Sequence, residues 1–161
     1  MKILYIITFL TALFLVIPCS MAGEGPGAKI YEQFNQGAYF QAIDLLSDLE
    51  QKKQSAHPTV WYWKAICYQK LQDHKEANHF FEKAIGTGVF PKEIYYQYGQ
   101  SLFADNNVSE ARKYFNKSWQ SGIKPGHSLF YIAYTYQLDN QYEDAIKYYK
   151  QLNQLGKIDP N

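Results

Sequence analysis

The chain has 161 residues, of which 47% are hydrophobic and 17% aromatic, including 15 tyrosines and 10 phenylalanines. This length fits one domain, and the apolar share is large enough to bury a core, which argues against a disordered chain. Lys and Arg total 16 against 15 acidic residues, so no excess of positive charge is available to neutralise a phosphate backbone. Nucleic acid is therefore not expected as a partner, and the abundant tyrosine favours contact surfaces.

The first segment has the features of a secretory signal. Lys2 supplies a positive charge, residues 3–17 form a nearly unbroken apolar run, and Ser20-Met21-Ala22 offers small residues for cleavage before Gly23. An uncleaved anchor is the alternative, but the run is shorter than the roughly 20 residues that span a bilayer. We therefore expect residues 1–22 to be a signal peptide and the chain to be exported to a bacterial periplasm, with secretion as an alternative.

Cys19 leaves another route of processing open. The run Val16-Ile17-Pro18-Cys19 resembles a bacterial lipoprotein box, although Pro18 stands where such boxes have a small residue. A lipid on Cys19 would anchor the protein to the outer membrane. If cleavage follows Ala22 instead, Cys67 remains alone, so no intramolecular disulfide can form and Cys67 is expected to be a packed thiol.

From Gly37 onward, one sequence pattern repeats at intervals of about 34 residues. Each copy has an alanine after a turn-like stretch and a large apolar residue four positions later. Small residues stand twelve positions before the last three alanines, with apolar residues around them. They predict another helix ahead of the one that carries the alanine, so that each copy is a helix pair. The alanines are Ala42, Ala77, Ala111 and Ala145, and the earlier small residues are Ala65, Gly99 and Ala133.

Turn and proline signals separate these helices. Turns within the pairs are expected at Asn35-Gln36-Gly37, Gln72-Asp73, Asp105-Asn106-Asn107 and Asp139-Asn140-Gln141. Prolines stand between the pairs, where a helix start tolerates them and a helix interior does not. They are Pro58, Pro91, Pro125 and Pro160.

The residues between Pro58 and Gly86 resemble the tetratricopeptide repeat. The matching positions are Trp61, Ala65, Tyr68, Ala77, Phe81 and Ala84, and two later copies repeat them less fully. The resemblance implies an all-α fold, a right-handed α-solenoid of antiparallel helix pairs. It also implies a repeat domain over residues 23–161, with units of about 23–57, 58–91, 92–125 and 126–161. The first unit departs from the pattern at Ile30 and Gln33, as terminal repeats often do.

The same resemblance implies where a partner binds, because the first helices of successive repeats line a concave groove in this family. We expect the repeat markers to pack in the core and the residues between them to bind the partner. Tyr62 and Tyr96 should face the groove, so that replacing both by Ala would leave the fold intact. The expected groove residues are Tyr31, Phe34, Tyr62, Ile66, Gln69, Tyr96, Gln100, Phe103, Phe130, Tyr134 and Gln137.

This groove would be aromatic and neutral. Related domains that clamp a terminal carboxylate use Lys, Arg and Asn there, whereas this chain has Tyr62, Ile66 and Tyr96, which argues against such a clamp. Contiguous exposed rings mark interaction sites. The alternative is that the rings fill the interior of the superhelix or contact another copy of the chain.

Residues with catalytic or metal-binding chemistry are sparse. His74 and His79 are five positions apart on different helical faces and lack a metal motif, so no metal site is expected. The sequence has no Gly-rich phosphate loop and no nucleophile elbow. Asn107 and Asn116 begin glycosylation sequons, which matter only in a eukaryotic secretory pathway. We expect no cofactor and no enzyme; a catalytic His is a remote alternative.

The leading hypothesis is a non-enzymatic protein-interaction module that binds an extended or helical segment of an envelope protein and assists its assembly. A self-associating scaffold is the alternative. Tyr148 and Leu152 near the C-terminus are expected to form a second contact surface, for a homodimer or for the partner, because the end of a solenoid leaves apolar surface uncovered.

Overall fold

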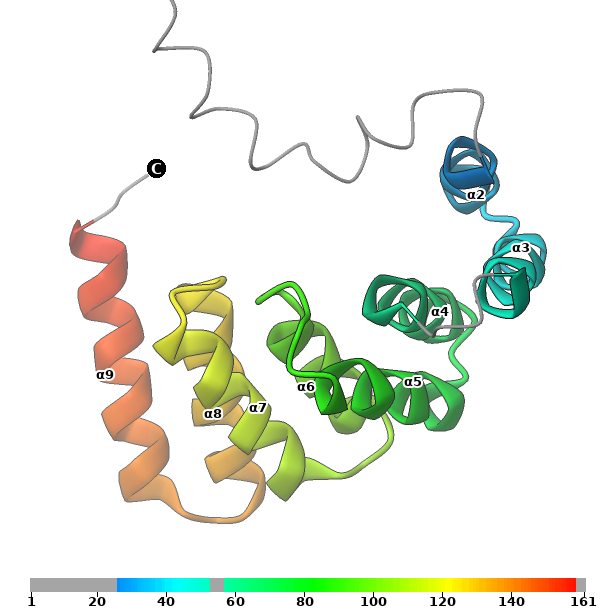
Figure 1. The fold of residues 1–161 in the computed structure, drawn as a ribbon. Coiled ribbons are helices and arrows are strands. Elements are labelled where there is room, and N and C mark those ends of the chain that lie inside the picture. The colour runs from blue at the N-terminus through cyan, green and yellow to red at the C-terminus, as the bar shows by residue number, and fades with distance from the viewer. Residues whose placement is uncertain (1–25, 53–56, 159–161) are drawn as a thin grey trace, which may run out of the picture. The chain divides into compact units, whose positions relative to one another are not determined.

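The computed structural model describes residues 26–52 and 57–158. All regular secondary structure in these two ranges is α-helical, as expected (Figure 1). The helices are α2 (Pro26–Asn35), α3 (Tyr39–Lys52), α4 (Pro58–Lys70), α5 (His74–Gly86), α6 (Ile94–Ala104), α7 (Val108–Gln120), α8 (Pro125–Leu138) and α9 (Tyr142–Ile158). The predicted signal peptide, Cys19 and Pro160 lie outside the described residues.

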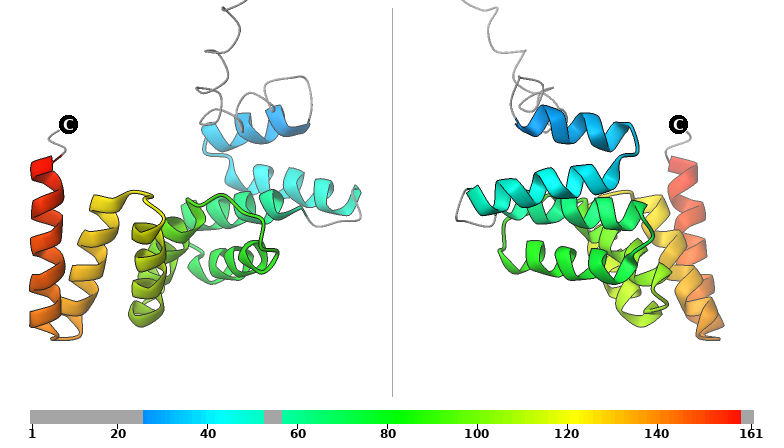
Figure 2. Two further views of the ribbon diagram at one scale, coloured as in Figure 1. Left: turned by 60° about the vertical axis from the view of Figure 1, so that its left-hand side comes forward. Right: turned by 90° about the vertical axis from the view of Figure 1, so that its right-hand side faces the viewer.

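The chain divides into two compact units, Met1–Ala56 and His57–Asn161. In the first unit α2 packs on α3. In the second unit α4 packs on α5, α6 on α7 and α8 on α9, and successive pairs meet through α5 with α6 and through α7 with α8. Figure 2 shows α8 and α9 running side by side in opposite directions. The predicted solenoid of antiparallel helix pairs is thus confirmed, while the single domain over residues 23–161 stays a prediction.

The turn inside each helix pair is the same structure built from different residues. Gly37, Gln72, Asn106 and Asn140 stand at equivalent places and all have positive φ, between 59° and 76°. In the third pair the Asn106 N–H donates to the Phe103 carbonyl, and the Asn107 N–H donates to the Leu102 carbonyl at 2.8 Å. These bonds satisfy carbonyls that the helix end leaves open. All four predicted turns are confirmed.

The helix starts also follow the sequence signals. Pro58 and Pro125 are the first residues of α4 and α8, where a missing N–H costs nothing. Before α5, an Asp73 carboxylate oxygen accepts a hydrogen bond from the Glu76 N–H at 3.2 Å. Such a cap stabilises a helix by about 1 kcal/mol.

Small residues allow the helices of each pair to approach closely. Ala77 and Ala111 are fully buried, as are the rings of Phe81 and Phe115. At Gly99 an added Cβ would lie 2.9 Å from the Phe115 ring, closer than van der Waals contact allows. The large ring on α7 therefore requires the absence of a side chain on α6, which explains the small residue at this position of the repeat.

Some repeat markers are only half-buried, and cations cover their rings. The Lys83 ammonium lies 5.1 Å from the centre of the Trp61 ring. One repeat later the Lys117 ammonium lies 5.8 Å from the Tyr95 ring and 4.3 Å from the Tyr114 ring. Cation–π contacts of this kind stabilise by about 0.5–1 kcal/mol at exposed sites. Part of the high aromatic content thus serves helix packing rather than partner binding.

Candidate functional site

The predicted groove residues of α4 are mostly buried. Tyr62 and Ile66 belong to the core, and the Tyr62 ring centre lies 6.3 Å from that of Phe81. Burial, with a smaller contribution from Glu93, raises the pKa of Tyr62 to about 12. Gln69 is half-buried and donates from Nε2 to the Gln97 carbonyl on α6 at 3.0 Å. The prediction that Tyr62 and Ile66 face an open groove is therefore wrong.

Tyr96 on α6 is also a core residue, with 5% of its surface exposed. Its ring centre lies 5.9 Å from Phe115 and 6.2 Å from Tyr131. Burial first, and Tyr131 second, raise the pKa of Tyr96 to about 12. The Tyr96 hydroxyl accepts a hydrogen bond from Gln100 Nε2 at 3.2 Å. Replacing Tyr62 and Tyr96 by Ala would therefore open cavities, and the expectation that the fold would not change is wrong.

One ring near the end of the second unit is open to solvent, with two half-buried rings beside it. Phe130 on α8 is 45% exposed, and Tyr134 stacks on it with ring centres 6.1 Å apart. Phe103 on α6 is half-buried and lies 5.8 Å from Tyr134. We call Phe103, Phe130 and Tyr134 the open ring surface. These three predicted site residues are brought together by two helices of successive pairs.

Tyr131 holds this surface to the core, and the sequence did not single it out. Its ring stacks on the buried Phe115 at 4.6 Å and 9°. It also lies 5.6 Å from both Phe103 and Phe130. The residues one and two repeats earlier, Gln97 and Trp63, give no common signal for such a role. Each ring of the open ring surface consequently packs against another ring.

The three residues of the open ring surface carry no charge, and an amide and a hydroxyl lie close to them. Gln137 is exposed, and its Oε1 accepts a hydrogen bond from the Tyr149 hydroxyl at 3.2 Å. The Tyr149 ring lies 6.4 Å from Phe130. Tyr149 was expected in the core as a repeat marker, yet it is only half-buried. The surface therefore suits an apolar or aromatic segment with backbone groups that can hydrogen-bond amides.

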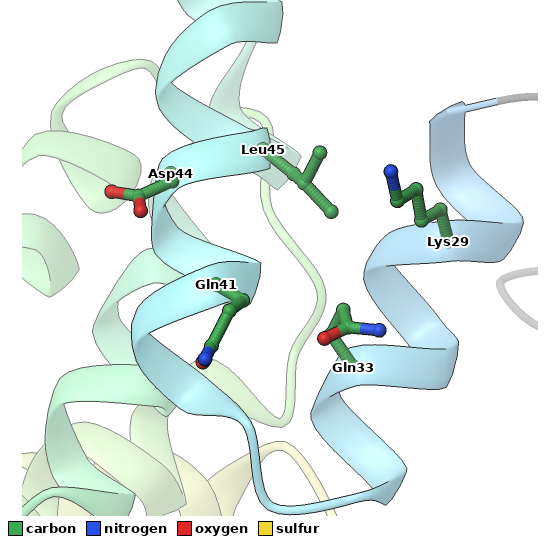
Figure 3. Close-up of a pocket in the computed structure, with 5 residues that line it drawn as sticks. All are labelled: Lys29, Gln33, Gln41, Asp44 and Leu45. Atoms are coloured by element: carbon green, nitrogen blue, oxygen red, sulfur yellow. The ribbon is translucent and has the colours of Figure 1, made fainter.

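The remaining predicted groove residues, Tyr31 and Phe34, belong to the first unit. Tyr31 is exposed, and Phe34 packs edge-on against Tyr39 with ring centres 5.4 Å apart. Figure 3 shows a shallow hollow in the same unit, between α2 and α3. Leu45 points toward α2 across the gap, whereas the Asp44 carboxylate points away from it. The hollow is lined by Lys29, Gln33, Gln41, Asp44 and Leu45, a set that suggests no particular chemistry.

The two residues of the predicted second contact surface lie on the side of α9 that faces α8. Tyr148 is half-buried, stacks on Tyr136 with ring centres 5.4 Å apart, and meets Trp119 edge-on. Leu152 is also half-buried and lies 3.7 Å from the position that a Cβ on Gly126 would take. Both side chains thus pack toward α8. Their helical position faces the partner helix of the same pair, which the apolar pattern alone does not reveal.

The described parts of the chain contain no group of three or more His, Cys, Asp or Glu residues placed to hold a metal ion. His79 lies edge-on against Phe80, and His74 is at the start of α5. In the same parts, no helix is both long enough and apolar enough to cross a membrane. Cys67 is a buried free thiol, as expected, and burial raises its pKa to about 12.

Comparison with known proteins gives a consistent result for the fold. Residues 58–87 and 92–118 match the tetratricopeptide repeat, and residues 127–155 match a second form of the same repeat. These ranges correspond to the three helix pairs of the second unit. No curated protein matches the sequence.

Several solved MamA structures resemble most of the chain. MamA of AMB-1 superposes with a TM-score of 0.69 at 19% identity, over 80% of this chain and 69% of that one. MamA 41-end from Desulfovibrio magneticus RS-1 gives 0.71 at 14% identity, over 87% and 80%. MamA of MSR-1 gives 0.66 at 20% identity, over 78% and 71%. At these identities the likeness shows the fold alone.

Proposed function

Because the chain belongs to the tetratricopeptide repeat family, we propose that it is a non-enzymatic module that binds a segment of another protein through the open ring surface. Repeats of this family are in general interaction modules rather than catalysts. The observation that carries the proposal is the exposure of Phe130 within a connected set of rings. A folded chain seldom leaves contiguous aromatic surface in water unless something binds there.

The chemistry of the surface defines the bound segment. Phe103, Phe130 and Tyr134 offer ring faces and edges, and the nearby amide of Gln137 offers a donor. A partner segment that inserts one or two aromatic or aliphatic side chains among these rings would gain most of its binding energy there. A charged segment would lose hydration without gaining an ion pair. We therefore propose an uncharged, apolar segment, either helical or extended.

We further propose that the chain is exported and that the bound segment belongs to an envelope protein. The support is the sequence of residues 1–22, which has the order of charge, apolar run and small residues of a secretory signal. The proposed part in assembly rests on analogy between folds. The mass of the protein recovered from cells tests export: a start at Gly23 supports it, a lipid on Cys19 would place the protein on a membrane, and an intact Met1 contradicts it.

The binding proposal is tested with the Phe130→Ala variant. The partner is first identified by capture on the wild-type protein and mass spectrometry, and its affinity is then measured by titration calorimetry. We expect Phe130→Ala to raise the dissociation constant at least tenfold, since losing a hot-spot ring costs about 2 kcal/mol or more. The matched control is Phe40→Ala on α3, which removes a phenylalanine that is 67% exposed.

Two outcomes contradict the binding proposal. If Phe130→Ala binds the partner with wild-type affinity, the open ring surface is not the site. If Phe40→Ala weakens binding as much as Phe130→Ala, the loss reflects general apolar surface rather than this ring set.

A further inference from the structure

Within the second unit, side chains at one position of the repeat join successive helix pairs. Asn78 on α5 donates from Nδ2 to the Asp105 carboxylate after α6 at 3.0 Å. One repeat later, Arg112 on α7 donates to the Thr135 hydroxyl at 3.0 Å and to the Asp139 carboxylate beyond α8. The next residue in this series, again one repeat later, is Ile146 on α9. It is 53% exposed and apolar.

The exposed side of α9 forms a continuous stripe around Ile146. Tyr142 is 55% exposed, and Ile146, Tyr149 and Asn153 follow it at successive spacings of four, three and four residues, which places them on one helical face. The equivalents of Tyr149 in the earlier pairs are Phe81 and Phe115, and both are fully buried. We call Tyr142, Ile146, Tyr149 and Asn153 the α9 stripe. It occupies the repeat positions that join earlier helix pairs, but it has no polar side chain equivalent to Asn78 or Arg112.

Head-to-tail stacking of copies does not suit this stripe. The residues that face the preceding pair include Tyr98 and Ser101 in α6 and Asp105 just after it. The equivalent residues are Lys29 and Glu32 in α2 and Gln36 just after it, all of them exposed. Gln36 Nε2 donates to a Glu32 carboxylate oxygen at 3.1 Å. Docking α2 on another copy's α9 would bury these polar groups against Ile146, which is costly.

The charges beside the stripe favour an antiparallel pairing with the same stripe. Glu143 and Lys150 are both exposed and lie one heptad apart on the same flank of α9. When two copies of a helix cross antiparallel, the same flanks meet. Glu143 of each copy then faces Lys150 of the other, while the helix dipoles oppose each other favourably. The stripe is thus complementary to itself in charge sign.

We propose that the α9 stripe binds the α9 stripe of a second copy of this chain, in an antiparallel dimer with two-fold symmetry. Two-fold interfaces use the same patch on both subunits and are the commonest way for soluble proteins to associate. Ile146 and Tyr149 would lie at the centre, and the two Glu143–Lys150 pairs at the rim. The α9 stripe shares no residue with the open ring surface, although Tyr149 lies 6.4 Å from Phe130, and the inference does not depend on the proposed partner.

Sedimentation equilibrium of the purified protein tests the dimer. We expect a dimer for the wild-type protein and for Ile146→Leu, and a monomer for Ile146→Arg, because a guanidinium cannot be desolvated against its own symmetry mate. Circular dichroism checks that Ile146→Arg is folded, which we expect because Ile146 is exposed. A wild-type monomer at every concentration, or a dimer that persists in Ile146→Arg, overturns the proposal.

The orientation is tested by mixing charge variants. Glu143→Lys carries two like charges at the rim, and so does Lys150→Glu, so each variant alone should dissociate at least tenfold more readily than the wild type. Mixing them should restore association as a heterodimer, because opposite charges then face each other. If the mixture stays as weak as its components, the antiparallel arrangement is wrong.

The two surfaces are separated by exchanging the readouts. Phe130→Ala should keep the dimer mass while losing the partner, and Ile146→Arg should lose the dimer while keeping the partner. A wild-type monomer whose partner capture depends on Ile146 would show that another protein's helix, and not a second copy, occupies the α9 stripe.

Discussion

Tyr96 and Phe130 are 34 residues apart and occupy the same position of successive repeats, yet Tyr96 is 5% exposed and Phe130 is 45% exposed. Both project from the first helix of a pair. The difference comes from the following pair: its Tyr131 lies against Tyr96, in addition to Phe115 of Tyr96's own pair, whereas Phe130 has no later pair over it among the described residues. A repeat position therefore defines the direction of a side chain, and the next element defines whether that side chain is available.

The same lesson holds for Arg112 and Ile146. Arg112 is covered because Thr135, Asp139 and Tyr136 surround its guanidinium, with the Tyr136 ring centre 3.9 Å away. Ile146 keeps the direction but meets no such group, so an apolar residue there remains exposed. The last described helix pair thus differs from the earlier pairs mainly in how much of its surface is exposed, and less in its sequence pattern.

The largest expected contrast is between Tyr96→Ala and Phe130→Ala. Tyr96→Ala should lower the free energy of unfolding by about 3–5 kcal/mol, the usual cost of deleting a large buried ring. Phe130→Ala should cost about 1 kcal/mol or less, because much of that ring is already in water. Urea unfolding followed by circular dichroism measures both. Equal losses would mean that the exposure difference has no energetic consequence.

A smaller contrast is expected between two neighbours on α7. Arg112→Ala should cost about 2 kcal/mol, since it removes charge-assisted hydrogen bonds to Thr135 and leaves its carbonyl without that donor. Lys113→Ala removes an exposed ion pair with Glu110 and should cost about 0.5 kcal/mol at most. Thermal unfolding of both variants decides this. A Lys113 effect as large as that of Arg112 would refute the joining role of Arg112.

The smallest effect concerns the turn at Gln72. Its φ of 62° is unfavourable for a residue with a long side chain, by about 1–2 kcal/mol relative to glycine. Gln72→Gly should therefore raise the free energy of unfolding by about 0.5–1 kcal/mol, after allowance for the greater freedom of glycine in the unfolded chain. Asn106→Gly, at the equivalent turn, should change it less, because asparagine tolerates this conformation. A larger gain at Asn106 would contradict this account.

The repeat pattern allowed most of the fold to be predicted. Turn residues at Gly37, Asn106 and Asn140 mark the helix ends because they tolerate positive φ, a local property of each residue. The small residue at Gly99 marks the closest helix approach because the Phe115 ring fills the space beside it. Features of this kind depend on neighbours close in sequence or on a strict spacing, so a sequence reveals them.

The candidate site was predicted only in part. Phe103, Phe130 and Tyr134 do lie together on the surface, but Tyr62, Ile66 and Tyr96 were assigned to the same surface and are buried. On α9, Tyr148 and Leu152 were expected to be exposed, whereas Ile146 and its neighbours are. Periodicity distinguishes the faces of a helix but does not say which face a second helix covers.

The sequence by itself determined the helix pairs, their turns and the small residues at their contacts. These features follow from local backbone conformation and from a repeat spacing of about 34 residues. Only the tertiary structure decided which rings stay in water. Exposure depends on side chains that come from the next pair, such as Tyr131 over Phe115 and the α8 residues around Arg112. Those contacts join residues that no single repeat contains, so the open ring surface and the α9 stripe emerge only when the pairs are stacked.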